Sequence, residues 1–300
     1  MPNETKRLTA DEIDPQIFDL YDDYCHSTME RRDFLNRAAK LTVAGGSAVA
    51  MAEAMLPDYA NAHTVWFTDK RIKARYVTYD SPGGNSGKMR GYLVQPKGEG
   101  PFPAVLVVHE NRGLNPHIED VARKAAVAGF VALAPDGLYP VGGYPGNDVD
   151  GKKLQKSIDK KKLLKDLENS ARYLKKHKLS NGKLGAVGFC FGGFVVNHLA
   201  ATLGNDLDAG VPFYGRAVKG DAVNKVKSPM LFIYAENDKK VNAMIPDYHK
   251  ALKANGLKFE AETYPGTRHG FHNNSTPRFN EEQAKKAWNR TVEFFKKHLK

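Results

Sequence analysis

From about residue 74 onward, short continuous apolar runs alternate with stretches in which apolar residues recur at helical spacing. Continuous apolar runs are typical of strands that are buried on both faces. The expected strands of this kind are 104–108, 130–134, 184–187, 209–213 and 230–234, and a last strand at 259–264 closes the series. The expected helices between and after them are 116–128, 160–178, 194–203, 243–254 and 281–299. Strands and helices in alternation predict an α/β fold, with a mostly parallel central sheet and helices on both faces.

A second pattern precedes and interrupts this alternation. Residues 75–79 and 89–94 alternate in side-chain character around a glycine-rich turn at 83–87, which predicts an antiparallel hairpin. Residues 139–151 are rich in glycine and proline and predict a long loop. Such a loop more often lines a site than links domains, so its Tyr139 and Tyr144 are candidates for substrate binding. No internal repeat or second domain appears in residues 63–300.

The N-terminal residues 1–62 form a separate segment in composition. Arg31-Arg32-Asp33-Phe34-Leu35 is followed by a weakly apolar run from 38 to 55 and by Ala60-Asn61-Ala62. This order resembles a twin-arginine export signal with a cleavage triplet. It predicts a periplasmic or exported protein that engages the twin-arginine export machinery, with no stable membrane span. The alternative is an amphipathic helix that packs on the domain, or an anchor; without export the protein would be cytoplasmic.

Charge and cysteine content argue against several classes of partner and site. The formal net charge is +11, but the densest lysines, in residues 152–178, lie opposite the apolar positions of a helix and lack interleaved aromatic residues. They predict a solvated helix face and no nucleic-acid partner. Cys25 and Cys190 are the only cysteines, so no disulfide framework is expected. The pair His269 and His272 lacks the glutamate of a zinc motif, and we expect no metal and no cofactor.

The most informative stretch is LGAVGFCFGG at residues 184–193, which contains Gly188-x-Cys190-x-Gly192. It is the nucleophile-elbow pattern of the α/β-hydrolase fold, with cysteine in place of serine. The glycines are needed because nearby side chains would collide in the strained turn. The helix that follows favours a thiolate at Cys190. The alternative is a buried free cysteine beside glycines that permit close packing.

An acid and a base follow this turn in the order of the same fold. Asp238 comes after the strand at 230–234, and His269 comes after the last strand. A thiol nucleophile needs a base, and the base needs an orienting carboxylate. Glu236 is the alternative to Asp238, and His272 is the alternative to His269.

These residues, with VHENRG at 108–113 and APDGLY at 134–139, resemble the dienelactone hydrolase family over roughly residues 74–299. The resemblance implies that Cys190 is the nucleophile, His269 the general base and acid, and Asp238 its orienter. It further implies that Glu110 contacts the resting thiol. The backbone N–H groups of Asn111 and Phe191 would form the oxyanion hole.

The implied activity is hydrolysis of a small-molecule carboxylic ester or lactone through a thioacyl-enzyme. An acyltransferase or thioesterase would use the same triad, and a binding protein on the hydrolase fold is the alternative from another class. Family members that act on an acidic lactone have an arginine shortly after the histidine, whereas residues 270–274 here are neutral. We therefore expect neutral esters or lactones to be preferred, and we name Arg112, Arg216 and Arg268 as candidates for contacting an acidic group.

Overall fold

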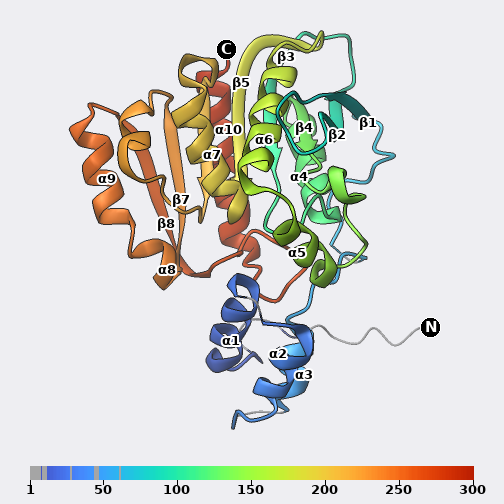
Figure 1. Ribbon diagram of the computed structural model, residues 1–300, viewed down its shortest axis with the longest axis vertical. Coiled ribbons are helices and arrows are strands. Elements are labelled where there is room, and N and C mark those ends of the chain that lie inside the picture. Colours follow the sequence, from blue (N-terminus) through green and yellow to red (C-terminus); the bar gives the residue numbers. More distant parts are fainter. Residues whose placement is uncertain (1–7, 9–11, 28, 44–46, 61) are drawn as a thin grey trace.

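The computed structural model describes residues 8, 12–27, 29–43, 47–60 and 62–300. In this part of the chain eight strands form one sheet, in the order β1-β2-β4-β3-β5-β6-β7-β8 (Figure 1). The strands are β1 (Ile72–Asp80), β2 (Lys88–Pro96), β3 (Phe102–Val108), β4 (Val131–Pro135), β5 (Ser180–Phe189), β6 (Ala209–Phe213), β7 (Met230–Asn237) and β8 (Phe259–Arg268).

Only the β1–β2 and β2–β4 pairs of this sheet are antiparallel, and the remaining pairs are parallel. The hairpin and the parallel strands were both expected from the sequence. The helices of this part are α4 (Pro116–Val127), α5 (Asp148–Ser157), α6 (Lys160–Lys175), α7 (Phe191–Thr202), α8 (Lys239–Asn242), α9 (Ile245–Ala254) and α10 (Glu281–His298). Short 3-10 turns are η2 (Tyr139–Val141), η3 (Gly204–Asp206) and η4 (Gly220–Lys225). The predicted α/β fold class is confirmed.

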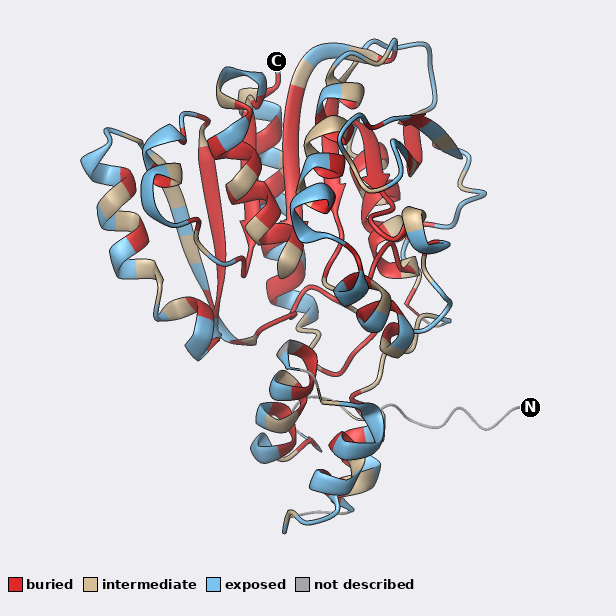
Figure 2. Ribbon diagram, in the orientation of Figure 1, coloured by how far each residue is buried: buried red, intermediate tan, exposed pale blue. Residues whose placement is uncertain are grey.

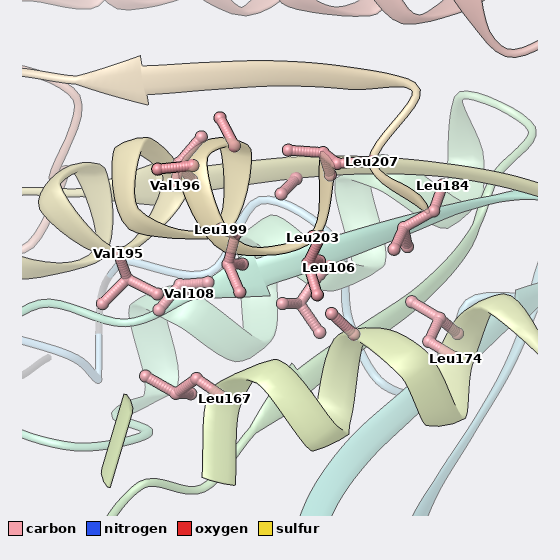
Figure 3. Packing of buried hydrophobic residues seen from close by; sticks show 14 of the residues in the cluster. Leu106, Val108, Leu167, Leu174, Leu184, Val195, Val196, Leu199, Leu203 and Leu207 are labelled. Atoms are coloured by element: carbon pink, nitrogen blue, oxygen red, sulfur yellow. The ribbon is translucent and has the colours of Figure 1, made fainter. Parts of the chain in front are cut away.

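Two hydrophobic layers hold the sheet between its helices, and the inner strands are mostly buried, whereas the edge strands β1 and β8 are largely exposed or half-buried (Figure 2). On one face α6 and α7 pack against β3 and β5 through residues such as Leu167, Leu199 and Leu106 (Figure 3). On the other face α4 and α10 cover the alternate side chains of the same strands, including Val107 and Val187. Burial on both faces explains why these strands are continuous apolar runs in the sequence.

The prediction of a loop over 139–151 is wrong from residue 148 onward, where α5 begins. The Asn147 side chain caps this helix by accepting a hydrogen bond from the Asp150 backbone N–H at 2.9 Å. Gly151 lies inside α5 because the helix passes close to another segment: a Cβ there would lie 2.3 Å from the Arg112 carbonyl oxygen. The glycine that made the segment look irregular in the sequence is thus a site of close packing.

The N-terminal segment forms helices α1 (Pro15–His26), α2 (Arg31–Ala38) and α3 (Ala48–Ala54). They share a hydrophobic core separate from the two layers of the sheet, and we call residues 12–56, as far as they are described, the N-terminal unit. The unit lies at the end of the molecule where α5 and α8 are found (Figure 1). Packing on the domain is the alternative that the sequence left open.

The boundary at residue 62 and the export signal stay predictions. Asn61 of the proposed cleavage triplet lies outside the described residues, whereas Ala62 is buried. Within the described part of the chain, no helix has the length and apolar character needed to cross a membrane.

Candidate active site

Cys190 lies at the sharp turn between β5 and α7. Its backbone has φ 56° and ψ −110°, a left-handed region that a non-glycine residue adopts only under strain. A Cβ on Gly188 would lie 2.2 Å from the Gly192 carbonyl oxygen, and one on Gly192 would lie 2.3 Å from the Val108 oxygen. Both glycines are therefore required by close backbone contacts, as the elbow pattern predicts.

Asp238 and His269 come together at the ends of β7 and β8. The Asp238 Oδ2 atom lies 2.5 Å from Nδ1 of His269, and both side chains are buried. Burial lowers the pKa of His269, but the charge of Cys190 and hydrogen bonds to Asp238 and Cys190 outweigh it and raise the pKa to about 9. The imidazole is therefore held between a carboxylate and the thiol.

The two rival residues have other partners. Glu236 is exposed, and its carboxylate accepts a hydrogen bond from the Gly266 backbone N–H at 2.8 Å. His272 is buried against Phe189, with ring centroids 4.9 Å apart and nearly parallel planes. Neither residue is part of the Asp238–His269 pair.

A cleft of about 490 Å³ opens beside Cys190. Asn111 and Phe191, the expected oxyanion-hole residues, line it together with Cys190 and His269. Its apolar lining residues are Leu163, Leu164, Phe191, Phe194 and Val241. Its cationic lining residues are Lys152, Lys156, Lys160, Arg216 and Lys240. We refer to this cavity as the cleft.

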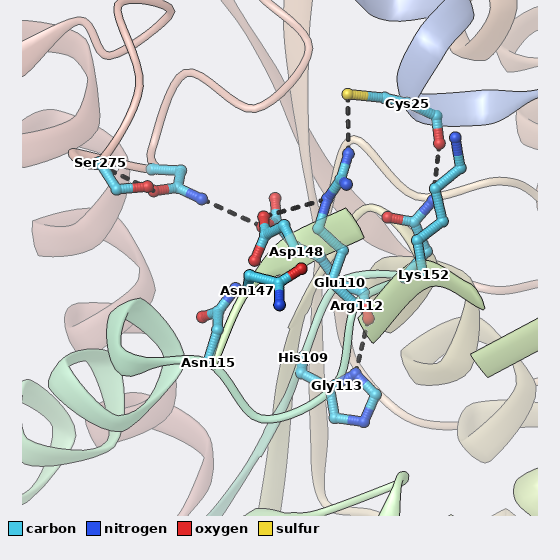
Figure 4. Close-up of polar contacts among 12 residues, drawn as sticks. Cys25, His109, Glu110, Arg112, Gly113, Asn115, Asn147, Asp148, Lys152 and Ser275 are labelled. Carbon is cyan, nitrogen blue, oxygen red and sulfur yellow. Dashed lines mark hydrogen bonds and ion pairs between the residues drawn. The ribbon is translucent and has the colours of Figure 1, made fainter. Parts of the chain in front are cut away.

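A second, much smaller cavity of about 10 Å³ also reaches Cys190 and His269, and we call it the inner chamber. Its lining includes Glu110, Arg112 and Asp148. The Arg112 Nε atom lies 3.3 Å from an Asp148 oxygen, and Figure 4 marks this ion pair. Burial, followed by the negative charge of Cys190, raises the pKa of Glu110. A carboxyl group with a raised pKa beside the thiol is typical of a functional site.

The sequence did not point to Arg278 or Tyr214, which also belong here. Arg278 is half-buried and lines the inner chamber, nine positions after His269 in the sequence. Tyr214 follows directly after β6, has φ 37°, and places its ring 4.8 Å from the His269 ring. Its position at the carboxyl end of a parallel strand was a usable signal, because such ends carry functional groups in α/β sheets.

The remaining candidates for substrate binding lie in different places: in the cleft, in or beside the inner chamber, or in neither cavity. Arg216 lines the cleft and Arg112 lines the inner chamber. Tyr144 donates a hydrogen bond to Asp148 at 2.9 Å and so orients a residue of the chamber. Tyr139 lines neither cavity, because the η2 turn places its ring against the Arg90 guanidinium, 5.6 Å from its centroid. Its role in substrate binding stays a prediction.

The strand order and the sharp turn between β5 and α7 define an α/β-hydrolase fold. The family model described as "Dienelactone hydrolase family" matches residues 89–299, and the chain belongs to this family. It is a carboxymethylenebutenolidase-like hydrolase, of the type that acts on esters or lactones. A second model, described as "YqhI-like", matches residues 4–40.

Individual relatives agree with this family. The chain is 35% identical over 227 residues to "Putative carboxymethylenebutenolidase" of Aquifex aeolicus, which spans 72% of this chain and 96% of that protein. It is 60% identical to "Putative hydrolase fragment YghX" of Escherichia coli over 114 residues, 38% of this chain and 97% of the fragment. A crystal structure of a "Putative Dienelactone Hydrolase" from Klebsiella pneumoniae has a TM-score of 0.64 and 27% identity, and covers 74% of this chain and 99% of its own.

Proposed function

We propose that the chain hydrolyses carboxylic esters or lactones with a Cys190–His269–Asp238 triad. The observation that carries the proposal is the placement of His269 between Asp238, at 2.5 Å, and the Cys190 side chain at the strained elbow. A base that contacts both a nucleophile and an orienting carboxylate is the minimal arrangement for nucleophilic acyl transfer.

In the proposed reaction the Cys190 thiolate attacks the carbonyl carbon and forms a C–S bond. The carbonyl oxygen becomes an oxyanion that accepts hydrogen bonds from the backbone N–H groups of Asn111 and Phe191. The C–O bond of the ester then breaks, and the protonated His269 gives its proton to the departing alkoxide. The product that remains is a thioacyl-enzyme.

Water completes the cycle. His269 takes a proton from a water molecule as that molecule attacks the thioester carbon. The C–S bond breaks, the acid leaves, and Cys190 returns to the thiolate paired with the protonated His269. Asp238 remains ionised throughout and holds the imidazole in the productive orientation. The raised pKa of Glu110 fits a carboxyl group placed near this negative sulfur.

The test is hydrolysis of p-nitrophenyl esters by the wild-type chain and by Cys190→Ala. We expect turnover to fall to the uncatalysed background in the variant, which should remain folded. Turnover at the wild-type rate by Cys190→Ala would overturn the triad. Absence of turnover by the wild-type chain toward esters, lactones and thioesters alike would favour a binding protein. Adding an acceptor alcohol and measuring the transfer product would separate a hydrolase from an acyltransferase.

We also propose, from the sequence alone, that Arg31 and Arg32 direct export by the twin-arginine route to the periplasm or beyond. Both arginines are exposed on α2, where a receptor could reach them. This route carries folded proteins, which suits a chain whose N-terminal residues fold against its catalytic part.

A further inference from the structure

Helix α1 contributes side chains to the catalytic end of the molecule. Tyr21 and Cys25 line the inner chamber together with Cys190 and His269. The Tyr21 side chain is only 1% exposed, and the Arg278 guanidinium lies 4.9 Å from the centre of its ring. An arginine over an aromatic ring at this distance makes a favourable cation–π contact. Tyr21 therefore covers the Arg278 charge.

Cys25 covers the other guanidinium of the chamber. Its sulfur accepts a hydrogen bond from Arg112 at 2.9 Å, and its carbonyl oxygen accepts one from the Asn111 side chain at 2.9 Å (Figure 4). Asn111 is the residue whose backbone we place in the oxyanion hole. Helix α1 thus contacts the loop that follows β3 at the point where it meets the cleft.

Lysines of the cleft hold the same helix from the outside. Lys240 pairs with Asp22 and Asp23 at 3.0 Å each. Lys156 donates to the Ser27 carbonyl oxygen at 2.9 Å, and Lys152 donates to the carbonyl of Tyr24. The carboxyl end of a helix carries partial negative charge, so cations are favoured there.

We propose that α1 is a wall of the active site and that Tyr21 is a specificity-determining residue. By filling the inner chamber it confines the substrate to the cleft and keeps an anionic acyl group away from Arg112 and Arg278. The volumes support this division, because the cleft holds about 490 Å³ and the chamber about 10 Å³, room for a single water at most. This inference rests on the proposed role of Cys190, and it applies to the full-length chain, because cleavage after Ala62 would remove α1.

The expected preference for neutral esters then has a different cause from the one that the sequence suggested. An arginine does reach the site after His269, but α1 covers it. Removing the Tyr21 ring would open a space beside the Arg278 guanidinium, and a carboxylate binds such a group strongly, whereas Arg112 in the same chamber is already paired with Asp148. Tyr21→Ala should therefore change the charge preference of the site, whereas Tyr21→Phe keeps the ring and serves as the matched control.

The first experiment needs no turnover. Iodoacetate and iodoacetamide are nearly equal in size and differ in charge, and peptide mass spectrometry reports their separate rates at Cys190. We expect the iodoacetate-to-iodoacetamide rate ratio to rise about tenfold in Tyr21→Ala and to stay within about twofold of wild type in Tyr21→Phe. If folded wild type, Tyr21→Ala and Tyr21→Phe all show the same iodoacetate-to-iodoacetamide rate ratio, the proposed role of Tyr21 is wrong. Because alkylation does not require catalysis, this result is separate from the fate of the proposed function.

The second experiment measures kcat/KM for the p-nitrophenyl monoesters of glutaric and pentanoic acid, whose acyl chains have equal length. We expect the glutarate-to-pentanoate ratio to rise about tenfold in Tyr21→Ala and to be unchanged in Tyr21→Phe. The double variant Asp22→Lys with Asp23→Lys faces Lys240 with like charge and should shift both ratios in the same direction. If Tyr21→Ala does not fold, the proposal is tested with the Asp22→Lys, Asp23→Lys variant. Alkylation and kcat/KM ratios equal to those of wild type in this variant would refute the proposal.

Discussion

The Asp238 carboxylate and the His269 imidazole lie 2.5 Å apart, between two loops that leave neighbouring parallel strands. Asp238 also caps α8, since its side chain accepts a hydrogen bond from the Val241 backbone N–H at 3.2 Å. The carboxylate is therefore fixed on both sides. A rigid carboxylate holds the imidazole in one orientation toward the Cys190 sulfur.

Replacing Asp238 by asparagine should lower kcat for ester hydrolysis by on the order of 10⁴-fold, because an amide no longer fixes the tautomer and charge of the imidazole. Glu236→Gln is the matched control, since this exposed carboxylate binds only the Gly266 backbone among the contacts described. We expect the control to remain within about threefold of wild type. If Glu236→Gln loses activity and Asp238→Asn retains it, Glu236 rather than Asp238 orients His269.

Stability should depend on pH through His269. Its pKa is raised in the folded chain from 6.5 to about 9, so the protonated imidazole stabilises the fold fully below pH 6.5. That contribution, on the order of 3 kcal/mol, should be lost as the pH rises from 6.5 through 9. The measurement is the difference in free energy of unfolding between wild type and His269→Gln across this range. The difference should shrink with rising pH, and a constant difference would contradict the pairing.

Cys190→Ser tests the cause of that shift. The Cys190 charge is the largest of the contributions that raise the pKa of His269. A serine hydroxyl stays neutral in this range, so the pH-dependent part of the stability should be markedly smaller in the variant. An NMR titration of the His269 ring would report the same change as a lower pKa.

Two glycine substitutions should differ sharply in cost. Gly192→Ala places a Cβ 2.3 Å from the Val108 carbonyl oxygen and 2.8 Å from that of His109, so backbone segments must separate. We expect a loss of several kcal/mol in stability and loss of turnover. Gly204→Ala, at φ 56° with no neighbour within 4 Å, should cost only about 1 kcal/mol from backbone strain. Equal costs would show that close packing at the elbow is not the constraint.

Export is tested by replacing Arg31 and Arg32 together with lysine. If the pair is the signal, the variant should stay in the cytoplasm at full length while wild type crosses the membrane. Sequencing the N-terminus of protein from its natural host provides the complementary measurement. Wild-type protein that begins at Met1 or Pro2 in the cytoplasm would remove the export proposal.

The sheet and the turn at Cys190 could be predicted from the sequence because local residue patterns encode both. Buried parallel strands need uninterrupted apolar residues, and the turn at Cys190 needs glycines at fixed positions around it. The order of Asp238 and His269 after their strands follows from the same topology. Pattern and position therefore sufficed to predict the fold and to name the principal site candidates.

Other features depend on contacts between segments far apart in the chain, and no local pattern encodes them. Arg278 reaches the inner chamber only because the loop after β8 folds back, with a Cβ on Gly270 lying 2.8 Å from its guanidinium. Tyr21 reaches the same chamber from the other end of the chain. The start of α5 was hidden because Gly151, which packs closely against the Arg112 backbone, reads as a loop residue.

The separate hydrophobic core of the N-terminal unit has a consequence for how the molecule unfolds. Its contacts with the catalytic part include ion pairs and hydrogen bonds, among them Lys240 with Asp22 and Lys153 with Glu30. Such contacts are weakened by added salt, whereas the core of the sheet is not. Added salt should therefore favour opening of this unit over unfolding of the sheet, and hydrogen exchange would report such an event as a sub-global opening. An opening of this kind would uncover the Arg112 and Arg278 guanidiniums, so amide exchange in α1 should become faster as ionic strength rises.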